Sequence, residues 1–282
     1  MSDNLRFRRR TLRTPIHRYA HPDTGRQITV IGMMHVGEPA YFERLREVID
    51  TLEAAGAVVQ REGSGRVPGD DHDLTDDEQT VLDLMDHQHV LEKRRITELG
   101  WVHQHDAFGD QPHRPKIDMG RVELIRRIGV DTMLGNTMRS IKMFDQPDTD
   151  PRSIERFRLK QHLYLRLFPV VVAAAQSRAR NTDPSHDIDT VLLDERNTIA
   201  LNGVRSTNRD VVLTWGCAHL PGLATGLLTD GYTRTGTTEW HTAITLPRIP
   251  TILWRIATGH TPDNHGSGRS AACETAVRSN SR

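Results

Sequence analysis

The spacing of apolar residues predicts strands and helices in alternation over the first sixty residues. Two apolar runs, Pro15–Ala20 and Gln27–Met33, flank the turn-forming residues His-Pro-Asp-Thr-Gly and predict a hairpin. A helix is predicted from Pro39 to Gly56, because its apolar residues recur at helical spacing. These residues are Leu45, Val48, Ile49 and Leu52. The apolar run Ala57–Gln60 predicts a further strand, and the short connections favour a parallel β-α-β unit.

The middle of the chain has mostly helical patterns. Thr75-Asp-Asp-Glu78 is a capping box that predicts a helix running to about Leu99. Further helices are predicted over Asp118–Ile128, Ile154–Arg180 and Ile188–Asn202, with a turn at 181–185 before the last. The chain then returns to a strand at Val211–Trp215, a short helix around Leu223–Leu228 and a final strand pair over Tyr232–Ala243. The predicted fold is α/β, with a mostly parallel central sheet flanked by helices and a helical insertion at about 75–202.

The two ends of the chain have the composition of flexible segments. Residues 1–14 contain five arginines and predict a basic flexible arm, whereas 260–282 predict a disordered tail rich in Gly, Ser, Asn and Arg. The segment between them, 15–259, is long enough for a single domain.

Charge and cysteine content narrow the class of protein. Basic and acidic residues both number 37, so the formal net charge is zero. This balance disfavours a nucleic-acid partner, including for the Arg8–Arg10 cluster, and favours a small molecule or a peptide. Cys217 and Cys273 are far apart and are expected to be free thiols in a reducing compartment. With no complete signal peptide and no apolar stretch long enough to span a membrane, we expect a cytoplasmic protein without a membrane partner; the sequence does not predict the oligomeric state.

Two strand ends carry the same pattern of residues. Gly32-x-x-His35 follows the strand that ends near Met33, and Gly216-x-x-His219 follows the strand 211–215. Glu62 comes directly after the strand that begins at Ala57. Because parallel strands end at one edge of a sheet, where open α/β proteins bind ligands, both imidazoles and the carboxylate are expected to converge there. The glycines allow a tight turn and a close approach of the following helix.

This group of side chains suits hydrolysis in two ways. His35, His219 and Glu62 could hold a divalent metal ion (Mn, Co or Zn) whose bound water becomes the nucleophile, and no organic cofactor is implied. Alternatively, one histidine acts as the general base and Glu62 orients it, without a metal. A third interpretation is purely structural, in which each histidine only caps a helix or hydrogen-bonds a backbone carbonyl.

Arg196 is an additional candidate for this site. It shares one face of the predicted helix with apolar residues, namely Ile188, Leu192 and Ile199. A guanidinium on the core-facing side needs a partner, so Arg196 could bind Glu62, bind a substrate carboxylate or stabilise an oxyanion. The structural alternative is a salt bridge to Asp194 or Glu195.

These motifs together resemble the TraB/PrgY/GumN family, which is related to the TIKI metalloproteases and more distantly to the erythromycin-esterase and ChaN-like proteins. The shared features are the first Gly-x-x-His, the strand ending in Glu62, Asp194-Glu195-Arg196-Asn197 and the second Gly-x-x-His with Leu220-Pro221-Gly222, in this order over 27–243. The resemblance implies an α/β core with a helical insertion and, in the TIKI branch, a metal-dependent peptidase. The positions that match the motifs of the family, and that the resemblance implies as site residues, are His35, Glu62, Arg196 and His219. The membrane anchors and signal peptides of several relatives are not expected here.

The resemblance leaves two functions open. The first is a metallopeptidase-like hydrolase that cleaves an amide or ester bond, and the second is a catalytically inactive protein that binds or sequesters a peptide or small molecule in the same cleft. The pheromone-shutdown branch of the family is understood as such a binding factor.

Other polar clusters are expected to be structural or solvated. His87 and His89 lie two residues apart on a predicted helix and therefore point to different sides. His103 and His105 are expected in a solvated polar loop, and the acidic run Asp70–Asp73 on the surface. Cys217 is expected to pack as a small apolar residue.

Overall fold

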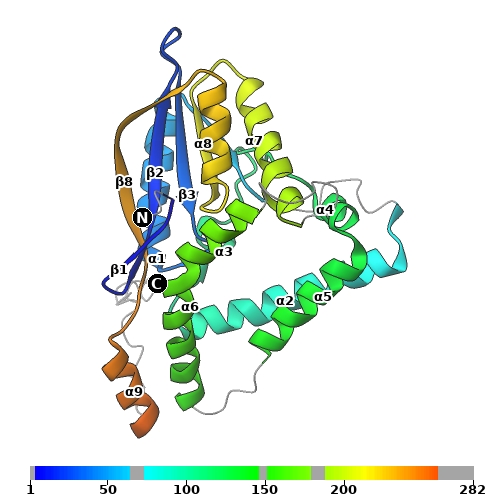
Figure 1. The fold of residues 1–282 in the computed structure, drawn as a ribbon, viewed down its shortest axis with the longest axis vertical. Helices are drawn as coiled ribbons and strands as arrows, with labels where there is room; N and C mark the ends of the chain where they lie inside the picture. Colours follow the sequence, from blue (N-terminus) through cyan, green and yellow to red (C-terminus); the bar gives the residue numbers. More distant parts are fainter. Residues whose placement is uncertain (1–3, 64–72, 146–150, 179–187, 260–282) are drawn as a thin grey trace, which may run out of the picture.

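The chain folds into an α/β structure around a six-stranded mixed sheet (Figure 1). The structure is a computed structural model that describes residues 4–63, 73–145, 151–178 and 188–259, without the side chains of 151 and 168–178. The strands lie in the order β1, β2, β3, β7, β5, and β8 also pairs with β2. Their bounds are β1 Arg6–Arg8, β2 Thr11–Ala20, β3 Gln27–Met33, β5 Val58–Arg61, β7 Val211–Gly216 and β8 Thr233–Thr245.

Three neighbouring strands of this sheet are parallel. β7 pairs in parallel with β3 on one side and with β5 on the other, whereas β2 pairs antiparallel with β1, β3 and β8. The predicted α/β class is therefore confirmed, but the sheet as a whole is mixed. The predicted hairpin is β2–β3, and the predicted β-α-β unit is β3, α1 (Pro39–Ala54) and β5, with β7 inserted between its two strands.

The register of the parallel strands aligns their carboxyl ends. Met33 of β3 pairs with Gly216 of β7, and Arg61 of β5 pairs with Thr214 of β7. The residues that follow β3 and β5, and those that end β7, therefore reach the same edge of the sheet.

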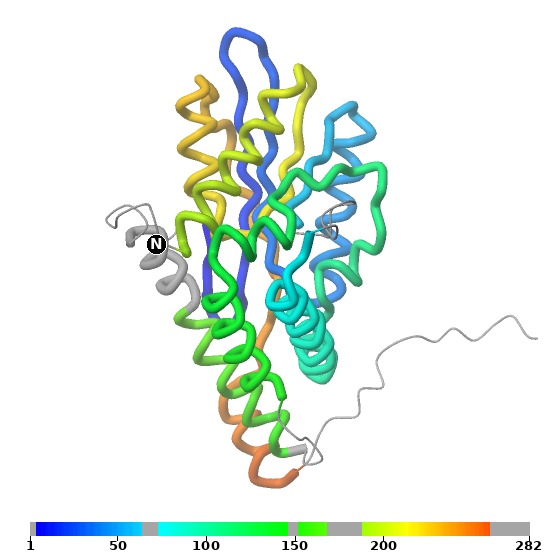
Figure 2. The backbone as a smooth tube through the Cα atoms, turned by 90° about the vertical axis from the view of Figure 1, so that its right-hand side faces the viewer, coloured from blue at the N-terminus to red at the C-terminus, as the bar shows by residue number. Residues whose placement is uncertain are grey.

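Alternate residues of the central strands enter two different cores, which is why these strands are apolar without alternation. Ile31 of β3 and Val212 of β7 pack on the α1 side, whereas Val30 and Leu213 pack on the other side against α7 (Arg196–Arg205) and α8 (Leu220–Thr229). Figure 2 shows the sheet between these two helical layers.

The other helices lie beyond the carboxyl edge of the sheet (Figure 1). They are α2 Asp76–Glu98, α3 Gln104–Phe108, α4 Arg121–Ile128, α5 Val130–Phe144, α6 Pro151–Arg178 and α9 Ile249–Thr258. A small third core joins α2 and α4 through Leu82 and Ile125, with α5 packed against it. Two short strands, β4 (Val36–Gly37) and β6 (Val102–His103), pair antiparallel and link the end of β3 to the start of α3. Within the described residues, no helix is both long enough and apolar enough to cross a membrane.

Two predictions about the ends of the sheet are wrong. The segment 5–14 is not a flexible arm, because Leu5 and Leu12 are buried and this segment forms β1 and the start of β2. The predicted strand pair over Tyr232–Ala243 is a single long strand, β8, which pairs with β2 instead of folding back on itself. The predicted turn at 181–185, the tail 260–282, Cys273 and most of the acidic run at 70–73 lie outside the described residues.

Candidate functional site

The carboxyl edge brings the sequence-predicted residues together around Gly216. A Cβ at Gly216 would stand 3.1 Å from Oε2 of Glu62, 3.7 Å from Nε2 of His35 and 3.7 Å from Cδ2 of His219. A side chain here would occupy the space that these three groups share, so the second motif glycine keeps this space open. Gly32 has a different role, since a Cβ there would lie 2.9 Å from Cδ2 of Leu220 and would force this side chain at the start of α8 to shift.

Glu62 is the buried acid of the site. Its side chain is 6% exposed, and its Oε2 accepts a hydrogen bond of 2.5 Å from the backbone N–H of Gly216. Its Oε1 accepts a 2.7 Å hydrogen bond from Nη2 of Arg196 and lies 3.4 Å from Nε2 of His219. Burial alone would raise the pKa of Glu62, but its contact with His219 and the positive charges of His35, His219 and Arg196 outweigh burial and lower it. Glu62 is therefore a carboxylate throughout the physiological range.

Arg196 binds two acids rather than one. It begins α7, directly after a π-helical turn (Thr190–Glu195), and its side chain is 11% exposed. Besides Glu62, its Nε and Nη2 donate to the two carboxylate oxygens of Asp118 at 2.8 and 2.7 Å. The predicted link to Glu62 is thus present, and the alternative salt bridge to Glu195 is not, since Glu195 pairs with Arg127.

Asp118 completes this ion cluster with a fully buried carboxylate. Its side chain is 0% exposed, and its oxygens also accept hydrogen bonds from the backbone N–H groups of Gly63 and Met119. It thus fastens the residue after Glu62 as well as Arg196. Asp118 has the geometry of a support for the site rather than of a group that meets a ligand.

His219 is oriented by Asn197 from the neighbouring helix. The Nδ1 of His219 lies 3.0 Å from Oδ1 of Asn197, so the ring carries its proton on Nδ1 and donates it to that oxygen. The ring packs edge-on against Trp215, with 5.0 Å between centroids, and is 3% exposed. A Cβ at Gly222 would collide with the Asn197 amide, which accounts for the glycine of Leu220-Pro221-Gly222.

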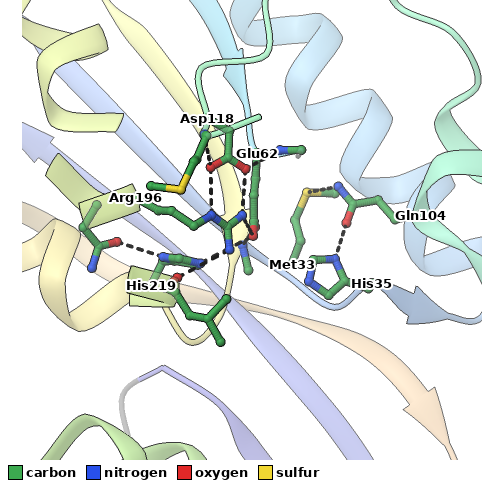
Figure 3. Close-up of polar contacts among 12 residues, drawn as sticks. Met33, His35, Glu62, Gln104, Asp118, Arg196 and His219 are labelled. Carbon is green, nitrogen blue, oxygen red and sulfur yellow. Dashed lines mark hydrogen bonds and ion pairs between the residues drawn. The ribbon is translucent and has the colours of Figure 1, made fainter. Parts of the chain in front are cut away.

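His35 is held in the same manner from the other side of the site (Figure 3). Its Nδ1 donates to Oε1 of Gln104 at 3.2 Å, while the amide group of Gln104 contacts the sulfur of Met33. The backbone N–H of Gln104 also donates to the carbonyl of His35 at 2.7 Å. Unlike His219, His35 is exposed and reaches solvent.

Both imidazoles therefore keep Nε2 free of these amide contacts, and both rings lie near Gly216. For His219, Nε2 lies 3.4 Å from Oε1 of Glu62. Two acceptor atoms at this distance repel each other unless a proton or a metal cation lies between them. A proton on Nε2 makes this contact an imidazolium–carboxylate ion pair, and a metal cation between the two atoms could take the place of that proton. The interpretation that each histidine only caps a helix is not supported, since His219 makes no side-chain capping bond at the start of α8.

The side chains of the site, in their present positions, meet only some of the requirements for binding a divalent metal ion. Two ligands on one ion with bonds of about 2.0–2.2 Å stand about 3–3.5 Å apart, and His219 and Glu62 have this spacing. Each Nδ1 is also fixed by an amide oxygen, as metal-ligating histidines require. Among the described residues, however, no three His, Cys, Asp or Glu side chains are arranged as a complete metal site. His35 has the right donor atom but is not in place as a third ligand.

A pocket of about 530 Å³ opens onto the site. His35, Glu62 and Arg196 line it, together with His89, His103 and others. His87 and His89 lie on α2 as predicted, with His87 exposed and His89 turned to the pocket. His103 and His105 were expected in a solvated loop; instead His103 belongs to β6, His105 to α3, and both line the pocket.

Cys217 is buried, and burial together with the nearby charge of Glu62 raises the pKa of its thiol. It packs as a small apolar residue, as predicted, and is not a nucleophile at neutral pH.

Comparison with known proteins does not assign this chain to a family. No family model matches the chain, and no curated protein or solved structure matches it either.

Three residues of the site were not predicted to belong to it. The sequence predicts Asp118 as the start of a helix and Asn197 as part of the Asp194–Asn197 motif, and it assigns no role in the site to either of them or to Gln104. Each acts through a partner from another element, and the one usable signal was that Asn197 directly follows Arg196 in the helix.

Proposed function

We propose that the protein is a hydrolase that cleaves an amide or ester bond in a small molecule or peptide bound in the pocket lined by His35, Glu62 and Arg196, with the buried His219 in contact with Glu62. One observation supports this most strongly: two imidazoles, each with Nδ1 held by an amide oxygen, lie beside one buried carboxylate. This arrangement serves to take and hold protons, or cations, at the mouth of a pocket.

The four residues have separable roles in this proposal. His35 is exposed, so its Nε2 can accept a proton from a water molecule that attacks the substrate carbonyl. The Glu62 carboxylate stabilises the positive charge that then develops on the imidazoles. Among the described residues, Nη1 of Arg196 has a single long contact of 3.4 Å, to the carbonyl of Leu192, so we assign this nitrogen to the oxyanion that forms on the substrate.

A divalent ion, Mn, Co or Zn, is the alternative to this base system. His219 and Glu62 would hold it, and His35 would have to move to become the third ligand instead of acting as the base; when bound, the ion would supply a Lewis acid and an activated water. We interpret helices α2 to α7, which lie between β5 and β7 in sequence, as the helical insertion of a TraB/GumN-like hydrolase. The order of the motifs at one sheet edge supports this assignment.

The test combines metal titration with an activity screen on the full chain. Metal-free protein is titrated with Mn²⁺, Co²⁺ and Zn²⁺ by calorimetry, and hydrolysis of a panel of nitrophenyl esters and a peptide mixture is measured with and without each metal. His35→Gln and His219→Gln are expected to remove the activity and weaken metal binding. His87→Gln is the matched control, because His87 is exposed on α2 and does not line the pocket.

Two outcomes contradict the proposal. If neither substitution alters metal binding or any hydrolytic rate, the site has no such function. If both substitutions abolish ligand binding while no ester or peptide is cleaved under any condition, the cleft belongs to a binding protein instead.

A further inference from the structure

The wall of the pocket has an unequal distribution of charge. Four Arg and Lys side chains and four histidines line it, whereas Glu62 is the one acidic side chain among the lining residues that the structure describes. A cleft with this bias concentrates anions from solution.

Two of the four permanent cations are already neutralised by acids. Arg196 pairs with Glu62 and Asp118, and Arg121 pairs with Asp86 at 2.6 Å. These two arginines therefore contribute little net charge to a ligand.

The other two cations lie side by side on the edge of the sheet. Lys116 forms a parallel bridge with Arg61, in which Arg61 donates its N–H to the carbonyl of Pro115 and Ile117 donates to the carbonyl of Arg61. Partners across such a bridge point to the same side, and both side chains line the pocket. This extended segment therefore adds a second cation next to Arg61 and close to Glu62.

Neither of these cations has an acid bound to it in the described part of the chain. The Nε and Nη2 of Arg61 donate to the backbone carbonyls of Arg114 and Gln111, which orient the guanidinium without neutralising it. Asp110 acts on Arg61 only through its charge. The stem of Lys116 passes over Gly63, with Cδ 3.5 Å from where a Cβ would be, and the residue is exposed.

We propose that the pocket selects substrates that carry an oxyanion, a carboxylate or a phosphate, and that Lys116 with Arg61 forms the seat for this group. The inference rests on the proposed function, because the seat opens into the same pocket as His35 and Glu62. The oxyanion would be anchored at the β5 edge while the bond to be cleaved lies beside the imidazoles. Lys116 is the specificity residue, since its ammonium is free to move onto the ligand, whereas Arg61 is fixed.

Binding of small probes tests this without any requirement for hydrolysis. Benzoate and benzamide have the same shape and differ in charge, and their affinities are measured by ligand-observed NMR for the wild-type chain. We expect benzoate to bind about tenfold more tightly, since one charge-assisted hydrogen bond is at stake. Lys116→Gln is expected to remove this preference, and Lys116→Arg to keep most of it. The control is Lys142→Gln, because Lys142 is exposed on α5 and does not line the pocket.

Inorganic phosphate distinguishes the two kinds of oxyanion. If phosphate displaces benzoate, both anions bind in the same seat. If phosphate binds and benzoate does not, and Lys116→Gln weakens phosphate binding, the seat is specific for phosphate. The inference is overturned if benzamide binds as well as benzoate, if Lys116→Gln keeps the preference, or if neither benzoate nor phosphate binds. A preference for benzoate in a protein that hydrolyses nothing would refute the proposed function and leave the seat in place.

Discussion

Arg196 donates a hydrogen bond of 2.7 Å from Nη2 to Oε1 of Glu62, although one residue begins α7 and the other directly follows β5. The same nitrogen lies 2.7 Å from Asp118, so a single guanidinium stands between two buried carboxylates. Removing the cation from such a cluster leaves uncompensated negative charge buried away from water. The resulting loss of folding free energy exceeds the net stabilisation that the ion pairs themselves provide.

We therefore predict that Arg196→Met destabilises the fold by about 3–5 kcal/mol. Urea unfolding followed by circular dichroism measures this change. The control is Arg127→Met, because Arg127 pairs with Glu195 on the surface and is expected to contribute less than about 1 kcal/mol. Equal midpoints for the two variants would show that Arg196 does not neutralise the buried acids.

Gly222 allows a second test, directed at the orientation of His219. We predict that Gly222→Ala displaces the Asn197 amide, frees the Nδ1 of His219 and lowers hydrolysis or metal affinity about 10- to 100-fold. The matched control is Gly135→Ala in α5, where a Cβ meets nothing within 4 Å and which should be neutral or slightly stabilising. Full activity in Gly222→Ala would separate Asn197 from the function of the site.

The local elements and the convergence of the site could be predicted, because each depends on a short pattern. Gly32 and Gly216 follow continuous apolar strands, and parallel strands share an edge, so His35 and His219 had to meet there. The supports of the site could not be predicted, since Asp118 reaches it from an irregular segment with no periodicity of its own.

The N-terminal strands were missed for a different reason. The turn between β1 and β2 places Arg9 and Arg10 at φ 50° and 81°, a conformation that usually selects Gly or Asn, so no turn residue signals the hairpin. The partner that buries Leu12 is Ile244 in β8, more than two hundred residues later in the chain. Strands fixed by such distant pairing leave little local pattern.

His103 should make stability depend on pH. Burial of its imidazole, together with the positive charges of His89 and His35, lowers its pKa to about 4, whereas an unfolded histidine titrates near about 6.5. Between these values the unfolded chain binds a proton that the folded chain does not, so stability is full above about pH 6.5 and falls as pH drops toward 4. We predict that His103→Gln reduces the loss of unfolding free energy at low pH by about 1–2 kcal/mol, after allowance for solvent screening. Urea unfolding at pH 7 and pH 4.5 measures it, and an unchanged pH dependence would contradict the shift.

Thiol chemistry should leave the site untouched. Because the pKa of Cys217 is raised by burial and by the charge of Glu62, iodoacetamide is expected to leave hydrolysis and ligand binding at wild-type levels in the folded protein. Mass spectrometry of labelled peptides would locate any modification. Rapid labelling of Cys217 with parallel loss of activity would indicate a nucleophilic thiol and a different mechanism.

We infer that His35, Glu62 and His219 form one site, with Nδ1 of each ring protonated and Nε2 of each ring sensitive to the carboxylate. Long-range ¹H–¹⁵N spectra of the imidazole rings, recorded for the wild type and for Glu62→Gln, test this inference. We predict Nδ1–H in both rings of the wild type and a shift of both Nε2 resonances in Glu62→Gln. Protonation of both rings on Nε2 only, with ring nitrogens that do not respond to Glu62→Gln, would contradict it.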